Sequence, residues 1–525
     1  MPRAGAAMRI LLSVAAAGLI VLTIVRTAIW WKTGAGISFA SGVMITMAAD
    51  LTKATFYRPL FGPAGYGGTR YFPLYFSLQA LLMKLGMPVL ASAYLLSAGA
   101  IVLLLWGTSR LLRELGAERW LAACAAVVLL ASSSVQMALT TPQADGLAAA
   151  LNIWGLAMIA RSAHNRRSTF PSALLFTLAW SAKVTTVFGL VAAFVWLALA
   201  NHKRMAWRLA LQTGCGYAMV AAVMMLASRG RVLEIFRACA SGGTNLQFLI
   251  AGPVRMESMA LYTDPILLPV TALALLGLFS WNRLRSLPGL LLIATLAVTI
   301  FIFGTPGTAQ NHLLDLQVAA VVLLARAALL RKQLGMGVLA LLTLAGGFML
   351  ARHMRTWSRW YHPHQFQQVI AAAAGRGPIL AENPIIPVLA GQQPYVLDPW
   401  MVQLLRTHFP GFQQPLLERL RRQEFGAVVL TTGAISENGA QEWFDNNSFG
   451  PGFVEALQQH YTLSQVIARD YIYLPKPSNR LAKSPSQQVD NAGCRATPRV
   501  VPELPLRNIQ NRSAKQNALI ASPAV

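Results

Sequence analysis

Residues able to do chemistry gather in one short stretch after the first apolar segment. Residues 47–60 read MAADLTKATFYRPL and hold the carboxylate of Asp50, the cations Lys53 and Arg58, and Tyr57, although only 12% of the chain is charged. The guanidinium of Arg58 carries a planar fork of N–H donors that matches the oxygens of a phosphate group. Contact with lipid headgroups would suit the same fork equally well. The stretch is therefore a candidate anion site.

A second candidate is Lys183, which lies midway through the apolar stretch 170–200. An ammonium group at membrane depth is costly unless it is paired, so a phosphate partner is a sensible expectation. The alternative is that the lysine extends its head to the interface. Arg70 and Tyr71 follow the first stretch in the chain, and Arg70 is a further candidate for phosphate contact.

Asp145, His312 and Asp315 complete the set of candidates. Asp145 stands in TTPQADG at an expected helix start, where an acid also suits the helix dipole without any further role. His312 and Asp315 lie one turn apart on one helix face. They either belong to a polar pocket or hydrogen-bond between helices, and a pair without a third ligand is weak evidence for zinc. Three further acids lie in or beside the loop 229–263: Glu234, Glu257 and Asp264.

The composition requires lipid as the solvent for most of these residues. The chain is 55% hydrophobic, and its mean hydropathy is +0.49, too apolar for a soluble globule of 525 residues. Eight of its 19 acids precede residue 353 and eleven follow it, which predicts a membrane part and a wetter tail. The net charge of +25 is scattered in short clusters, a pattern of membrane loops more than of a nucleic-acid surface.

About eleven segments approach the roughly 20 apolar residues that a spanning helix needs. The first is too long for the apolar core of a signal peptide and is interpreted as a retained helix. The stretch 170–200 is too short to cross twice, so it forms either a short re-entrant pair with Lys183 at the tip or one long helix. The predicted segments are 9–31, 88–108, 119–137, 145–160, 170–182, 184–200, 207–228, 264–281, 288–304, 312–330 and 335–351.

The basic loops fall on one side of the membrane if the stretch 170–200 counts as two passes. This predicts a cytoplasmic N-terminus and an outward loop 32–87. The turn at Asp145, the loop 229–263, the turn 304–311 and the C-terminal region then face outward as well. The basic residues concerned are Arg110, Arg113, Arg119, Arg161, Arg166, Arg167, Lys203, Arg204, Arg208, Arg283, Arg285, Arg326, Arg331 and Lys332.

Three regions follow from these patterns. Residues 1–352 form a helical membrane module, and its outer loop 32–87 contains a short helix over 73–85, with aromatic residues such as Tyr75 and Phe76 suited to headgroup depth. Residues 353–475 form an extracytoplasmic α/β domain, because short apolar runs alternate with an amphipathic PLLERLRRQEF segment. Residues 476–525 are rich in Ser, Asn, Gln and Pro and are predicted to be disordered.

The layout resembles the multi-spanning glycosyltransferases of the C-type superfamily. The resemblance rests on the apolar first helix, the loop pattern A.DL.....YRPL......RYFPLY...QALL.KLG, the turn TPQADG and SAKVTTVFG between two short helices. The branches it resembles are the protein O-mannosyltransferases with the lipid A aminoarabinose transferases, and the polyprenyl-phosphomannose-dependent mannosyltransferases. Roughly residues 9–475 take part.

The resemblance implies transfer of a sugar from a polyprenyl-phosphate donor to a lipid, glycan or protein acceptor, at the outer face of the inner (plasma) membrane. An acid in the first outer loop usually serves as the base, and Asp50 is the only acid there. Relatives often carry the acid several positions earlier, where this chain has Ser41. The expected mechanism inverts the anomeric carbon.

In that mechanism cations neutralise the departing phosphate. Lys183, with Arg58 or Arg70, is expected to contact it, and Asp145 to orient the substrate or an optional divalent cation. The other residues expected to line the substrate site are Tyr57, Tyr71 and His312.

Two alternatives stay open: a transporter or flippase of lipid-linked sugars, and an inactive relative that only binds the carrier. The halves of the chain do not repeat each other, which disfavours a transporter. No Walker, Rossmann, serine-elbow or HExxH motif occurs, so the sequence supports no nucleotide, hydride or zinc-protease chemistry.

Overall fold

The computed structural model separates the chain into two compact units, Met1–Lys476 and Pro477–Val525. Only Pro477 of the second unit is described, and the predicted disordered tail otherwise lies outside the described residues. The structure describes residues 2–165, 167–241, 246–264, 266–276, 278, 281–305, 307–328, 332–360 and 365–477 without 432–439.

Every one of the eleven segments predicted to span the membrane contains a helix. Within the described residues, six helices are long and apolar enough to cross a bilayer, or seven if the pair Arg119–Ala131 and Ser133–Thr140, bent by 80°, counts as one. The remaining four predicted spans are shorter apolar helices. The bounds are α1 (Pro2–Thr33), α4 (Val89–Glu114), α5 (Arg119–Val127), η1 (Val128–Ala131), α6 (Ser133–Thr140), α7 (Asp145–Asn165), α8 (Phe170–Ala182), α9 (Phe188–Leu199), α10 (Lys203–Ala227), α13 (Leu267–Leu276), α15 (Leu287–Phe303), α16 (Leu314–Ala328) and α17 (Lys332–Trp360).

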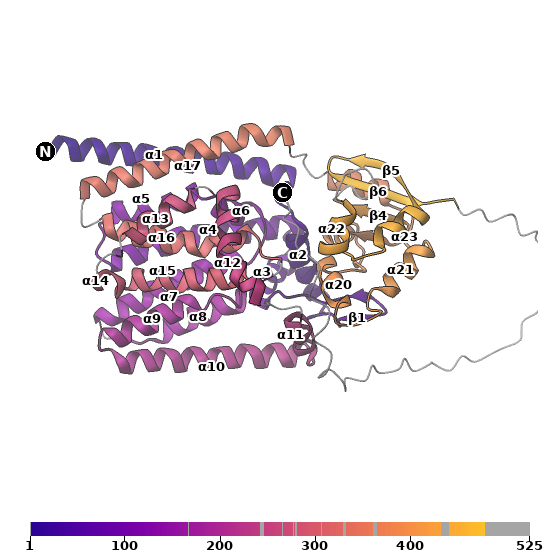
Figure 1. Ribbon diagram of the computed structural model, residues 1–525, viewed down its shortest axis with the longest axis horizontal. Helices are drawn as coiled ribbons and strands as arrows, with labels where there is room; N and C mark the ends of the chain where they lie inside the picture. The colour runs from indigo at the N-terminus through magenta and orange to yellow at the C-terminus, as the bar shows by residue number, and fades with distance from the viewer. Residues whose placement is uncertain are drawn as a thin grey trace, which may run out of the picture. The chain divides into compact units, whose positions relative to one another are not determined.

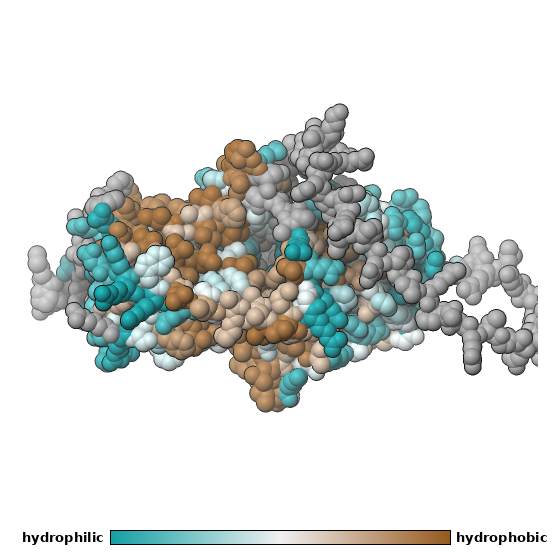
Figure 2. Space-filling view, turned by 90° about the horizontal axis from the view of Figure 1, so that it is seen from below, coloured by the Kyte–Doolittle hydropathy of each residue, from teal (hydrophilic) through white to brown (hydrophobic). Residues whose placement is uncertain are grey.

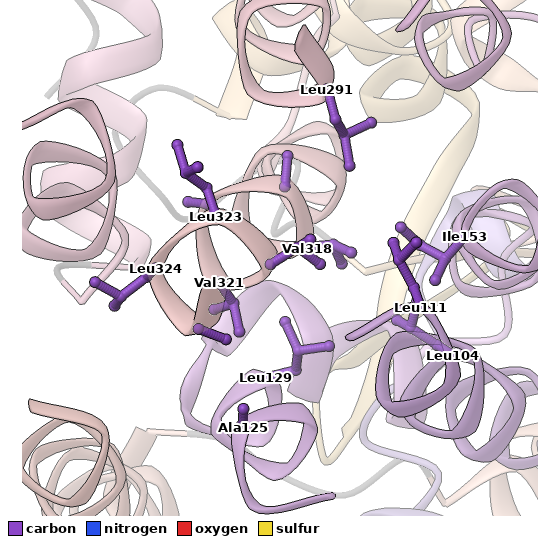
Figure 3. Close-up of a cluster of buried hydrophobic side chains, with 14 of the residues drawn as sticks. Leu104, Leu111, Ala125, Leu129, Ile153, Leu291, Val318, Val321, Leu323 and Leu324 are labelled. Atoms are coloured by element: carbon purple, nitrogen blue, oxygen red, sulfur yellow. The ribbon is translucent and has the colours of Figure 1, made fainter. Parts of the chain in front are cut away.

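The helices pack in a bundle around α16 (Figures 1 and 3). The sequence LDLQVAAVVLLARAA of this helix is apolar on nearly all faces, as expected of a helix surrounded by others. Val318 and Val321 of α16 meet Leu129 of η1, while Leu104 of α4 and Ile153 of α7 close the same core. Outward-facing side chains of the bundle form an apolar band bounded by hydrophilic residues (Figure 2), which agrees with a membrane protein.

The first outer loop contains a helix that the sequence analysis missed. Helix α2 (Phe39–Thr52) is capped by Ser38, whose hydroxyl accepts a hydrogen bond from the backbone N–H of Ser41. The middle of the helix is buried. Helix α3 (Pro73–Lys84) confirms the predicted short helix. Tyr75 and Phe76 of this helix are buried within the protein, and the Tyr75 hydroxyl lies 3.0 Å from that of Ser97. Their position at headgroup depth stays a prediction.

The tail domain, residues 365–476, has the predicted α/β architecture. Its four strands lie in the order β3-β4-β6-β5, with β3 and β4 parallel and the other pairs antiparallel. The strands are β3 (Ile379–Ala381), β4 (Ala427–Leu430), β5 (Tyr461–Ile467) and β6 (Asp470–Pro475). The helices are α18 (Phe366–Ala373), α19 (Ile385–Leu389), α20 (Pro399–Arg406), α21 (Gln414–Arg421), α22 (Ala440–Asn447) and α23 (Phe453–His460). Helix α17 continues to Trp360, past the predicted domain boundary at residue 352.

The tail domain is joined to the first outer loop by backbone hydrogen bonds. The loop forms a small hairpin of β1 (Phe61–Gly62) and β2 (Gly65–Tyr66). Tyr66 donates its N–H to the carbonyl of Tyr395 at 2.7 Å and accepts from the N–H of Leu397 at 2.9 Å. Gly65 has a φ of +105°, and a Cβ there would lie 1.9 Å from the Tyr395 carbonyl oxygen, so only glycine permits this approach.

Candidate functional site

Lys183 occupies a break between two short helices. Helix α8 ends at Ala182, Lys183 itself is extended, and α9 begins at Phe188. The Thr186 hydroxyl closes the turn by donating to the carbonyls of Ala179 at 2.9 Å and Lys183 at 2.5 Å. The stretch 170–200 is therefore a helical hairpin, which confirms that alternative over one long helix.

The ammonium group of Lys183 lies between two buried carboxylates. Its Nζ donates to Asp145 Oδ1 at 2.7 Å and lies 3.8 Å from Asp315 Oδ2. Asn311 Nδ2 donates to the same oxygen of Asp145 at 2.9 Å. These four residues, here called the lysine cluster, come from the start of α7, the α8–α9 break, η2 (Gln310–Leu313) and α16. Asp145 and Asp315 are only 6% and 8% exposed, so two acids share one cation away from bulk water.

His312 lies beside the lysine cluster. The charges of Lys183, Asp145 and Arg70 all act on its ring. Its Nδ1 is buried and has no hydrogen-bond partner in the part of the chain that the structure describes. A buried ring nitrogen without a partner is a position where a substrate polar group would gain a hydrogen bond.

Arg70 and Tyr71 lie where the outer loop meets the tail domain. The guanidinium carbon of Arg70 is 4.9 Å from the centre of the Trp400 ring. Tyr71 is acted on by the charges of Arg70, Asp145 and the tail-domain residue Asp398, and burial raises the pKa of its hydroxyl. Tyr71 thus links the lysine cluster with the tail domain. Neither Asp398 nor Trp400 was among the site residues predicted from the sequence.

Asp50 and Arg58 form a buried ion pair with each other. Arg58 Nε donates to Asp50 Oδ2 at 2.6 Å, and its NH2 nitrogen donates to Oδ1 at 2.8 Å. The remaining NH1 nitrogen donates to the Pro394 carbonyl at 2.7 Å. The pair lines a small hollow together with Tyr57, whose hydroxyl donates to the Tyr71 carbonyl at 2.8 Å. The role of Asp50 as a base stays a prediction, and both of its oxygens are already occupied.

The residues that the structure describes show no evident ligand set for a metal ion. Among the described residues, no group of three or more His, Cys, Asp or Glu side chains lies close enough to hold one. Asp264, one of the acids noted near the loop 229–263, is held by hydrogen bonds within the protein. It accepts from Ser132 Oγ at 2.5 Å and from the N–H and hydroxyl of Ser134 at 3.1 Å each. It thereby secures the bend before α6.

Arg26 is a buried cation that the sequence analysis missed. It lies in the last third of α1, is 6% exposed, and stacks 4.3 Å from the Trp30 ring. Its NH1 nitrogen donates to the Gln136 carbonyl at 3.1 Å and to Gln136 Oε1 at 3.3 Å. The sequence does show an arginine inside an apolar span, and such residues are usually paired or functional. It holds the last turn of α6, four residues before the helix that begins at Asp145.

Comparison with known proteins identifies the fold. No family model matches the chain, and no curated protein sequence does. The oligosaccharyltransferase AglB of Archaeoglobus fulgidus, in complex with an inhibitory peptide and a dolichol-phosphate, matches with a TM-score of 0.56 and 13% identity over 89% of this chain and 74% of that one. The apo form of the same enzyme matches with a TM-score of 0.54 and 12% identity over the same shares.

A structure of ArnT from Cupriavidus metallidurans bound to undecaprenyl phosphate aligns with a TM-score of 0.45 and 12% identity, over 88% of this chain and 98% of that one. The AglB structures, whose TM-scores are higher, identify the fold of this chain. The predicted architecture, a multi-spanning helical module followed by a C-terminal α/β domain, is therefore confirmed, and the chain has the fold of the archaeal oligosaccharyltransferase.

Proposed function

We propose that this protein is an integral membrane glycosyltransferase that moves a sugar from a polyprenyl-phosphate donor to a lipid, glycan or protein acceptor. The observation that carries the proposal is the buried lysine cluster, at a helix break, in the fold of an enzyme that has been solved with dolichol-phosphate. The ammonium of Lys183 and the guanidinium of Arg70, whose charges both act on the His312 ring, are suited to the charge of a lipid phosphate.

The site and the tail domain face the outside of the cell's inner (plasma) membrane in this proposal. The clustering of Lys and Arg in the loops of the opposite side supports that orientation. The hydrogen bonds between the tail domain and the first outer loop support it as well. A donor whose lipid lies along the apolar band would then present its phosphate to the lysine cluster from the membrane side.

The reaction is a displacement at the anomeric carbon with inversion. The acceptor oxygen forms a bond to that carbon, the bond from the carbon to the phosphate oxygen breaks, and its electron pair leaves with the polyprenyl phosphate. Lys183 and Arg70 stabilise the charge that develops on this leaving group. The longer contact of Lys183, at 3.8 Å to Asp315, is the one that a phosphate oxygen replaces, while Asp145 keeps the ammonium oriented.

Carrier binding tests this assignment. Purified protein in nanodiscs is titrated with undecaprenyl phosphate, and Lys183→Met is compared with Lys53→Met, which removes an exposed cation of the same outer loop. Loss of a buried partner of a phosphate should weaken binding by about 30-fold or more, whereas the exposed control should change it by less than about threefold.

Lys183→Arg separates a binding defect from a folding defect, because it keeps the charge between Asp145 and Asp315. It should unfold at nearly the wild-type temperature and recover much of the carrier binding. Wild-type affinity in Lys183→Met would refute the assignment of the phosphate site.

A further inference from the structure

The tail-domain segment 394–401 forms part of the wall of the site. Besides the two backbone hydrogen bonds to Tyr66, the segment offers the Pro394 carbonyl to Arg58 at 2.7 Å. Met401, at its end, lies 3.8 Å through its sulfur from Cys239 of α11 (Arg231–Ser241). The segment is therefore fixed from both sides by elements of the membrane module.

Trp400 brings this segment against two parts of the site at once. One side of its ring faces the guanidinium of Arg70. A Cβ on Gly307, which has a φ of +71°, would lie 2.7 Å from Trp400 Nε1, so the turn that precedes Asn311 and His312 is in tight contact with the indole. The tail domain thus meets both the outer loop and the turn that leads into Asn311 of the lysine cluster.

Asp398 is the acid that this segment carries. It is 2% exposed, and it begins α20 by accepting a hydrogen bond from the Trp400 N–H at 3.2 Å. No cation lies within 4.0 Å of its carboxylate in the described part of the chain. The charge of Arg70 acts on it, and its own charge acts on Tyr71 and on Cys239.

Four other buried carboxylates among the described residues lie beside a cation or beside hydrogen-bond donors. Arg58 occupies both oxygens of Asp50, and Lys183 lies between Asp145 and Asp315. The acid at the end of α12 (Leu246–Thr263) accepts three hydrogen bonds from two serines. A carboxylate neutralised by a bidentate arginine is a weak base, because protonation must break the ion pair.

We infer that Asp398 of the tail domain is the base that accepts the proton of the acceptor hydroxyl, and that the acceptor binds between the tail domain and the first outer loop. This inference rests on the proposed transferase function. The hydroxyl proton moves to the Asp398 carboxylate as the acceptor oxygen bonds to the anomeric carbon, and the electron pair of the broken bond leaves with the polyprenyl phosphate beside Lys183.

The environment of Asp398 suits this role. Burial raises the pKa of its carboxyl from 3.8 to about 6, while Arg70 and the N–H groups of Trp400 and Met401 oppose the shift. A base acts best when its pKa approaches the working pH. The groups that face it are Arg70 and Tyr71 of the outer loop and Cys239 of α11.

Variants that preserve the helix cap test the inference. Asparagine and serine both cap helices as aspartate does, so Asp398→Asn and Asp398→Ser remove the base and retain the hydrogen bond to Trp400. The full chain in nanodiscs is given undecaprenyl-phosphate-linked hexoses and pentoses with a membrane lipid extract, and released undecaprenyl phosphate is measured. Glu455→Gln, an exposed tail-domain acid, is the matched control.

Asp398→Asn and Asp398→Ser should release undecaprenyl phosphate about 100-fold more slowly or worse, the usual contribution of a positioned base. Both variants should unfold at or above the wild-type temperature at neutral pH, because they lack the buried charge of ionised Asp398. Their binding of undecaprenyl phosphate should match the wild type, and Glu455→Gln should be fully active. The wild-type rate should fall as the pH drops through about 6, because protonated Asp398 cannot accept the proton.

Normal turnover in both Asp398 variants would overturn the inference and leave Asp398 as a helix cap only. Loss of turnover confined to Asp50→Asn would overturn it in favour of the acid predicted from the sequence. A wild-type protein that releases no carrier from any of these donors would instead overturn the proposed function, and with it this assignment.

Discussion

The ion pair between Asp50 and Arg58 should behave as a structural clamp, and its removal has a calculable effect. The two side chains are 12% and 5% exposed, and Arg58 also holds the Pro394 carbonyl of the tail domain. Asp50→Leu leaves a lone buried guanidinium, whereas Arg58→Met leaves a lone buried carboxylate and a carbonyl without its donor. The double variant leaves neither charge.

The magnitudes follow from this geometry. Each single variant loses one partner of a buried pair and should lower the free energy of unfolding by about 3–5 kcal/mol. Arg58→Met should lose about 1–3 kcal/mol more through the orphaned Pro394 carbonyl. The loss at the Pro394 carbonyl is the same in the double variant, so it cancels when the coupling free energy is calculated from the single and double variants. The double variant leaves neither charge, so it should lose only about 1–3 kcal/mol through the Pro394 carbonyl, which is several kcal/mol less than the sum of the two single losses.

The assay is unfolding of the purified protein in mixed micelles of dodecyl maltoside and increasing dodecyl sulfate, followed by tryptophan fluorescence. Turnover of the folded fraction is measured on the same samples, with Asp50→Asn added because it is nearly the same size as aspartate. A clamp predicts that folded Asp50→Asn keeps its rate within about tenfold of the wild type.

Two results would refute this reasoning. A coupling free energy near zero would show that the ion pair contributes nothing to stability. A folded, stable Asp50→Asn protein without turnover would show that Asp50 takes part in the reaction itself.

Three further predictions follow from the same contacts. Gly307→Ala forces a Cβ into the space of Trp400 and should slow turnover by about 10- to 100-fold with carrier still bound, measured by release of undecaprenyl phosphate. Arg26→Lys keeps the charge but loses the NH1 nitrogen that reaches both oxygens of Gln136 and the planar group that stacks on Trp30, and thermal unfolding should show a loss of about 1–3 kcal/mol. Asp398 has a raised pKa of about 6, so the folded state holds its proton more tightly than the unfolded state does. The stability that this proton contributes is present below pH 4 and is lost as the pH rises through 6, by on the order of 3 kcal/mol, and this slope should disappear in Asp398→Asn.

The spanning helices could be predicted from the sequence, because the length of an apolar run is read directly from consecutive residues. Each predicted segment contains a helix, including the hairpin with Lys183 at its turn. The bend at Ser132 was not predicted, since its cause is the distant carboxylate of Asp264, to which Ser132 and Ser134 donate.

Helix α2 shows where pattern reasoning failed. Its sequence FASGVMITMAADLT is apolar or small on every side, so it has no amphipathic period. The helix is buried between the bundle and the tail domain, and tertiary packing, not a local pattern, accounts for it. Gly42 illustrates this contact: a Cβ there would lie 1.9 Å from Asn383 Oδ1.

The candidate site was predicted in its parts and not in its connections. Lys183, Asp145 and Asp315 were each noted because charge is rare in their surroundings, but only the fold brings them to one point. Asp50 and Arg58 pair across a turn in which Ala54 and Tyr57 adopt positive φ angles, a backbone path that residue types alone did not indicate. Asp398 stands before a proline at a helix start, where its capping role is evident and any further role is not.

The most direct test of the central claim is the fate of a polyprenyl-phosphate-linked sugar, labelled in both its sugar and its lipid, in vesicles that contain the purified protein. A glycosyltransferase separates the two labels: the lipid is recovered as polyprenyl phosphate, the sugar on a new acceptor, and the process stops in Lys183→Met. Intact donor that crosses the bilayer with both labels still joined would contradict the account and identify a transporter instead.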